Sequence, residues 1–199
     1  MPRTKEANAR IREVQRAHIL EAAWRVFARK GTTATMAEIA AEASVSNGLV
    51  YRYFSTKEAL FAELVERTTQ SSLNRVQQTL DLPGTSFERF TFLLSGALAW
   101  LREHPGYALL THHVTSDETT PESLRALVSQ QGHFTQEAMR RLIVEGQAAG
   151  QIAEGDPDQL LFTLESCLIG LALSATSQSP EQFQRHFPDI EVLLRLLKP

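Results

Sequence analysis

The chain has 199 residues, of which 43% are hydrophobic and 22% are charged, a composition typical of a folded globular protein rather than a disordered one. It holds a single cysteine, which excludes an intramolecular disulfide and a cysteine-rich zinc site. The formal net charge is −3, but residues 1–67 carry 11 basic and 8 acidic side chains, whereas residues 68–199 carry 9 and 15, so the N-terminal third is the part suited to a polyanion.

Three segments bear on cellular location. The N-terminal residues lack the apolar core of a signal peptide. The apolar stretch at 90–101 is too short to span a bilayer, and the one at 160–175 is interrupted by Glu165. We therefore expect a cytoplasmic protein.

Apolar residues recur at helical spacing along the chain, and no stretch shows the alternation typical of a strand. This spacing predicts a first helix that ends at Gly31, short helices over 36–43 and 49–54, and a long helix that stops before Pro83. Helix-start signals in the sequence mark where two of these helices and several later ones begin. They are Thr35 with Glu38, Ser55 with Glu58, Thr85 with Glu88, Thr120-Pro121, Asp156-Pro157 and Ser179-Pro180. We expect an all-α protein of about nine helices, with an N-terminal helix-turn-helix domain and a C-terminal helical domain.

The segment 35–54 carries the functional signal. Two short helices are separated by Ala43-Ser44-Val45, the length of a helix-turn-helix connection. In such a unit the second helix enters the major groove of DNA, and its N-terminal residues face the base edges. Its first turn holds small or hydrogen-bonding residues, Tyr51 and Arg52 follow at positions that can reach a phosphate or a base, and Lys57 opens the next helix at a position suited to phosphate. Each of these side chains could instead serve only as a cap, a turn, a packing residue or a solvated charge.

Residues 12–67 resemble the DNA-binding domain of the tetracycline-repressor (TetR) family of bacterial transcriptional regulators. The matching residues are Ile19, Ala22, Ala23, Phe27, Gly31, Thr35, Ile39, Ala40, Val45, Ser46, Gly48, Tyr51, Tyr53, Phe54, Lys57 and Leu60. The resemblance implies a homodimer that binds a palindromic operator, usually as a repressor released by a small ligand. It also implies a DNA-binding domain over 12–67 and a ligand-binding and dimerisation domain over 68–199, and we expect the basic residues 1–11 before them to form a mobile arm.

Carried over residue by residue, the resemblance assigns roles within the motif. It places Thr35 and Lys57 on phosphates, Tyr51 and Tyr53 near the DNA backbone, and Ser46, Asn47 and Gly48 at or near bases. Ser44 departs from the family, which usually has glycine in the turn. If that position requires a positive φ, serine costs about 1 kcal/mol there. The basic arm could reach DNA, although such a tail is more often mobile and solvated.

The C-terminal domain is expected to enclose a pocket for an effector that the sequence does not identify. Candidate lining residues are Phe92, Gly96, Trp100, Tyr107, His113, Phe134 and Cys167. For any one of them, ordinary core packing is the alternative.

The last helices carry an apolar seam that could pair with its copy in a two-fold four-helix interface, as the resemblance also implies. The candidate interface residues are Leu164, Leu168, Leu171, Ala175, Ile190 and Leu194. Packing within one chain is the alternative, because an apolar stripe does not choose its partner.

Other functions find less support in the sequence. His133 and Glu137 lie one helical turn apart, but they belong to no metal-binding signature, so we expect neither a metal nor a cofactor. An all-α enzyme lacks a Gly-rich phosphate loop and a nucleophile-elbow motif here. A helical interaction protein that does not bind DNA is the third possibility, and the basic N-terminal third argues against it.

Overall fold

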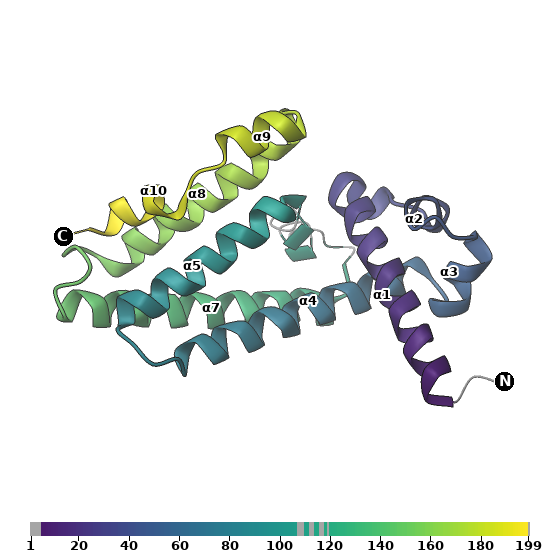
Figure 1. The fold of residues 1–199 in the computed structure, drawn as a ribbon, viewed down its shortest axis with the longest axis horizontal. Coiled ribbons are helices and arrows are strands. Elements are labelled where there is room, and N and C mark those ends of the chain that lie inside the picture. The colour runs from purple at the N-terminus through teal and green to yellow at the C-terminus, as the bar shows by residue number, and fades with distance from the viewer. Residues whose placement is uncertain (1–4, 107–109, 112–113, 116–117, 119, 199) are drawn as a thin grey trace. The chain divides into compact units, whose positions relative to one another are not determined.

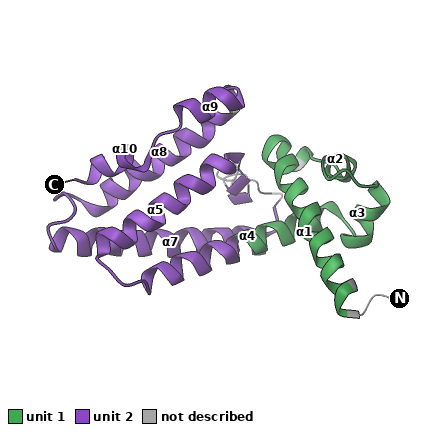
Figure 2. Ribbon diagram, in the orientation of Figure 1, with its two compact units in different colours: residues 1–68 green, residues 69–199 purple. Residues whose placement is uncertain are grey.

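The computed structural model describes residues 5–106, 110–111, 114–115, 118 and 120–198. Within these ranges the chain forms nine α-helices and no strand, which confirms the all-α prediction (Figure 1). It divides into two compact units, residues 1–68 and 69–199 (Figure 2).

The first unit holds the predicted short helices and their supports. Helix α1 spans Lys5–Lys30 and is followed by the 3-10 turn η1, Gly31–Thr33. Helices α2 and α3 span Met36–Glu42 and Asn47–Tyr53, and α2 packs against both α1 and α3. Helix α4, Lys57–Leu80, begins in this unit and ends in the second.

The second unit is built on α5, which packs against α7, α8 and α10. Its helices are α5 over Ser86–Glu103, α7 over Glu122–Ala148, α8 over Pro157–Ser177, α9 over Pro180–His186 and α10 over Ile190–Leu194, with the 3-10 turn η2 over Arg195–Leu197. Phe90, Leu94, Leu142 and Ile143 lie at the centre of its core and are almost fully buried.

Most helices begin where the sequence predicts. Thr35 and Thr85 each form a complete capping box with the glutamate three residues later. Asp156 and Ser179 also cap their helices, each with proline in the first turn.

Two predicted caps are wrong by one residue. Helix α4 is capped by Thr56, whose Oγ accepts a hydrogen bond from the backbone N–H of Ala59 at 3.1 Å, and not by Ser55. Helix α7 begins at Glu122, so Pro121 occupies the cap position and Thr120 lies one residue too early. Only the residue directly before the first helical residue can reach the free N–H groups of the first turn.

The described residues before position 12 continue the first helix. Helix α1 extends back to Lys5, so residues 5–11 are its first turns rather than a separate extended tail. Residues 1–4 lie outside the described part of the chain.

One helix of the described part, over Pro157–Ala175 in α8, is long and apolar enough to cross a membrane by length and composition alone. Leu161 and Leu164 on this helix are buried in the core of the second unit, whereas Phe162, Ile169 and Leu173 are exposed. The helix therefore has two apolar faces, of which the chain's own core covers one.

Candidate nucleic-acid interface

The connection between α2 and α3 is a Schellman motif. The backbone N–H of Val45 donates to the carbonyl of Ala40 at 2.9 Å, and the N–H of Ser44 donates to the carbonyl of Ala41 at 3.0 Å. This pattern requires a left-handed residue between the two helices, and Ser44 has a φ of 52°. Ser44 therefore has the positive φ that makes serine less favourable than glycine at this position.

The face of α3 that turns away from the core is polar. Ser46 caps the helix by accepting a hydrogen bond from the N–H of Leu49 at 3.2 Å. Val50 and Phe54 are buried and fix the orientation of the helix. The residues left exposed are Ser46, Asn47, Gly48, Tyr51 and Arg52, whereas Tyr53 is half-buried.

Thr35 and Lys57 lie at the N-terminal ends of α2 and α4. In its capping box the backbone N–H of Thr35 donates to the Glu38 carboxylate, and the Thr35 hydroxyl oxygen accepts a hydrogen bond from the Glu38 backbone N–H. The hydroxyl proton of Thr35 is therefore able to donate to a phosphate. Lys57 is the first residue of α4 and is half-buried. Both residues lie where a helix dipole favours an anion.

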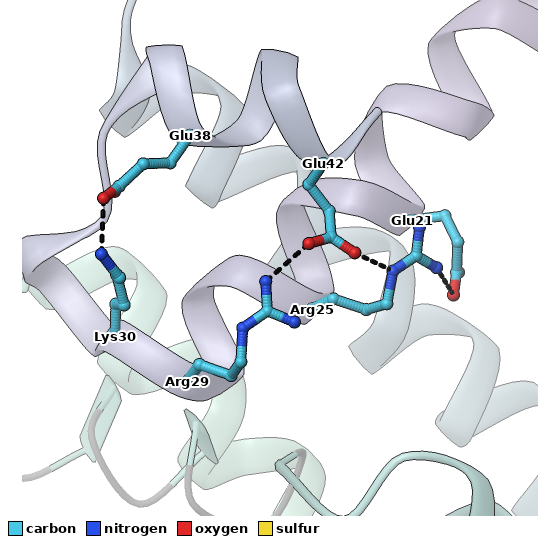
Figure 3. Close-up of polar contacts among 6 residues, drawn as sticks. All are labelled: Glu21, Arg25, Arg29, Lys30, Glu38 and Glu42. Carbon is cyan, nitrogen blue, oxygen red and sulfur yellow. Dashed lines mark hydrogen bonds and ion pairs between the residues drawn. The ribbon is translucent and has the colours of Figure 1, made fainter. Parts of the chain in front are cut away.

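The acidic residues of α2 are neutralised by α1. Figure 3 shows that Lys30 binds Glu38, while Arg25 and Arg29 bind the two oxygens of Glu42 at 2.8 and 2.6 Å. Glu21 contributes a further contact to Arg25. The Lys30 ammonium, together with the Thr35 cap, lowers the pKa of Glu38 to about 2, and Arg25 and then Arg29 lower the pKa of Glu42. Helix α2 can therefore approach a polyanion without presenting unpaired carboxylates.

A second set of ion pairs ties α1 to the end of α3 and the start of α4. The Arg16 guanidinium forms a bidentate pair with Glu63 and donates to the backbone carbonyl of Tyr53 at 3.4 Å. It also lies 4.6 Å from the ring centroid of Phe54. The sequence did not predict the pairing of Arg16 with Glu63, because partners 47 residues apart leave no local pattern.

In the second unit, the predicted pocket residues do not all gather. Phe92, Gly96 and Trp100 line a cavity of about 440 Å³ between α4 and α5. Phe134, on α7, and Cys167, which packs against the core, do not line it. Tyr107 and His113 lie outside the described residues. The other residues that line the cavity are Arg75, Gln78, Thr79, Leu82, Ala99 and Glu103.

The predicted interface residues are turned toward the chain's own core. Leu164 and Leu194 are only 1% and 4% exposed, and Leu168, Leu171 and Ile190 pack against the same core. Ala175 is half-buried. Leu164 and Leu194 therefore lie inside the unit, whereas the other four residues are only partly buried, and their place in a dimer interface stays a prediction. The outward apolar residues are Phe162, Ile169 and Leu173 on α8, Val192 on α10 and Leu196 in η2.

Within the described ranges, no group of three or more histidine, cysteine or acidic residues could hold a metal ion. His133 and Glu137 are both exposed on α7.

A protein-family model and related proteins match parts of this sequence. The model of a family described as "Bacterial regulatory proteins, tetR family" matches residues 19–64. The nucleoid occlusion factor SlmA of Vibrio vulnificus is 27% identical over 147 residues, which cover 73% of this chain and 71% of that protein.

Solved structures share the fold over nearly the whole length. The ketosteroid transcriptional regulator KstR2 of Mycobacterium tuberculosis superposes with a TM-score of 0.71 at 17% identity, covering 92% of this chain and 95% of that one. The transcriptional regulator FadR of Bacillus subtilis, in complex with stearoyl-CoA, gives 0.56 at 18% identity and covers 89% and 96%. The match to the tetR family model therefore falls on the helix-turn-helix, within residues 19–64, and the fold of these solved regulators extends through both units.

Proposed function

We propose that this regulator binds duplex DNA as a homodimer, with α3 of each copy in the major groove of one half of a palindromic operator. The observation that carries the proposal is the polar outer face of α3, where Ser46, Asn47, Gly48, Tyr51 and Arg52 are exposed while Val50 is buried beneath them. A buried apolar side and an exposed polar side are what a recognition helix requires.

The residues divide into two roles. Ser46, Asn47 and Gly48, at the N-terminal end of α3, face base edges, because this end of a recognition helix enters the groove most deeply. The phosphate and backbone contacts come from side chains around them, which position the helix but carry little sequence information. These residues are Thr35, Tyr51, Arg52, Tyr53 and Lys57.

The dimer forms through the outward apolar face of α8 and the neighbouring C-terminal elements. Phe162, Ile169 and Leu173 are 71%, 54% and 51% exposed, and contiguous exposed apolar surface on this scale marks an interaction site. A second copy of the same face covers it through two-fold symmetry. This burial, rather than insertion into a membrane, accounts for the apolar character of α8 in a cytoplasmic protein.

The cavity between α4 and α5 is the effector site. Arg75, Gln78 and Thr79 line it from α4, and α4 is the helix that starts at Lys57, shortly after the recognition helix ends. A small molecule that binds better to one arrangement of α4 shifts the protein toward that arrangement and can release DNA. Repression relieved by such a ligand is the proposed mode of regulation, so the protein acts by binding and not by catalysis, without a metal or cofactor.

Selection of bound fragments from a pool of random duplexes tests the proposal. The wild-type protein should enrich a palindrome whose half-sites are about one helical turn apart. Its affinity for that site should fall linearly on a plot of log K against log salt concentration. A screen for small molecules that release the selected duplex then identifies the effector. Failure to bind any duplex DNA at low salt would refute the proposed function.

A further inference from the structure

The first turns of α1 carry a basic side chain that the helix-turn-helix does not account for. Helix α1 begins at Lys5, well before residue 19, where the family match begins. Arg12 and Arg16 lie one helical turn apart and therefore share a face of α1. Both reach the C-terminal end of α3, Arg16 at the Tyr53 carbonyl and Arg12 at the Tyr53 ring.

The two arginines differ in what holds them. Arg16 is committed to its bidentate pair with Glu63, which is also bound by Arg67 at 3.1 Å. Arg67 binds Glu13 as well, at 2.8 Å. Glu63 and Glu13 are therefore already neutralised, and the same contacts fasten the early turns of α1 to α3 and α4.

Arg12 is exposed, and its guanidinium carbon lies 5.9 Å from the centroid of the Tyr53 ring. In the ranges that the structure describes, it forms no ion pair with a carboxylate. Contact with an aromatic face orients a guanidinium while leaving its N–H groups free for an anion. The ring that orients it belongs to Tyr53, a residue placed near the DNA backbone.

We propose that Arg12, oriented by the Tyr53 ring, is a further phosphate-binding residue through which α1 extends the DNA interface beyond the helix-turn-helix. The inference rests on the proposed function, since it requires α3 to lie in the major groove. The ligand is a phosphate of the DNA backbone, so the contact adds affinity without adding sequence preference.

The test compares Arg12→Gln with Arg10→Gln on a random-sequence duplex, across a series of salt concentrations. Both variants remove one positive charge from an exposed position of α1. Two residues along a helix correspond to about 200° of rotation, so Arg10 points away from the side that carries Arg12. Because the duplex has no fixed sequence, the comparison does not depend on knowing the operator.

Loss of one phosphate contact should lower the slope of log K against log salt by about 0.9 for each subunit, or about 1.8 for a dimer. The ratio of the wild-type association constant for DNA to that of Arg12→Gln should thus shrink about 12-fold between about 50 and about 200 mM salt. Arg10→Gln should keep the wild-type slope. Arg12→Lys should restore most of the slope, because lysine keeps the positive charge. Circular dichroism should show that all three variants are folded.

Equal slopes for Arg12→Gln and Arg10→Gln, with a wild-type protein that binds, would overturn this inference and leave the proposed function intact. A smaller slope for Arg12→Gln that Arg12→Lys does not restore would also overturn it, since the residue would then act on the position of α3. A wild-type protein without affinity for duplex DNA would overturn both.

Discussion

Ser44 is the residue at which sequence and backbone conflict most clearly. It is the one non-glycine residue with a positive φ in the described part of the chain, and it occupies the left-handed position of the motif that ends α2. Helix α7 ends in the same motif with Gly150 at the equivalent position, where φ is 67°. A Cβ in this conformation approaches a backbone carbonyl, which glycine avoids.

We expect Ser44→Gly to raise the free energy of unfolding of the first unit by about 1 kcal/mol. The chain has two tryptophans, and Trp24 is buried in the first unit. In a Trp100→Phe background, urea unfolding followed by Trp24 fluorescence therefore reports on this unit. Ser44→Ala is the matched control, because it removes the hydroxyl but keeps the Cβ; equal stability of the two variants would contradict the role given to φ.

At the same scale, Asn47 is proposed to read a base, since its exposed amide lies in the first turn of α3. Asn47→Ala should relax the base preference at one position in each half-site, at a cost of about 1–3 kcal/mol in discrimination. Fragment selection with both proteins measures this directly. The Ser46 cap is unchanged, so folding should be unaffected, and an identical selected motif would remove Asn47 from the base-reading residues.

Among the elements, α2 is a short helix that depends on its neighbours. It has only seven residues, too few to be stable alone, and it is held by its capping box, by the buried Ile39 and Ala40, and by ion pairs with α1. The ion pairs also make α2 sensitive to pH.

Acidification should destabilise the first unit through Glu38 and Glu42. The pKa of Glu38 is about 2 in the folded protein, against about 4.3 in an unfolded chain. A depressed folded pKa stabilises the protein above the unfolded value, and this stabilisation is lost as the pH falls from about 4.3 toward about 2. Urea unfolding in the Trp100→Phe background, between about pH 7 and about pH 3, should show a steeper loss for wild type than for Glu38→Gln.

Glutamine can complete the capping box of Thr35 without a charge, so Glu38→Gln isolates the ionic contribution. Glu66→Gln is the control, because Glu66 is an exposed carboxylate on α4 without a base within ion-pair distance in the described residues. If wild type and Glu38→Gln lost stability in parallel over this range, the proposed source of the pH dependence would be wrong.

At the scale of the whole molecule, the second unit leaves one apolar face of α8 uncovered. A charge at Leu194 would enter the core and report on folding, because that side chain is only 4% exposed. A charge at Ile169 leaves the core intact and reports on the outer face.

Ile169→Glu should convert a dimer into a monomer and strongly weaken operator binding, since two linked half-sites bind much more tightly than one. Sedimentation velocity measures the oligomeric state. Val144→Glu, at a 41% exposed aliphatic residue of α7, is the control and should remain dimeric. An Ile169→Glu protein that sediments as an intact dimer would exclude this face of α8 as the interface.

The sequence by itself determined the helices, most of their caps and the helix-turn-helix, because these depend on residues within a few positions of one another. Thr35 and Glu38 satisfy each other across three residues, and Val45 and Phe54 mark a turn and a packed face within one short segment. Such contacts leave a pattern in the chain itself.

Only the tertiary structure decided which side of an apolar helix faces outward and which distant side chains meet. Leu164 and Ile169 are equally apolar in sequence, yet one is buried in the core and the other is exposed. The pairing of Arg16 with Glu63 and the gathering of Phe92, Gly96 and Trp100 around one cavity likewise depend on helices that pack across long stretches of chain. Hydrophobic burial has no direction of its own, so the choice of face was made by packing.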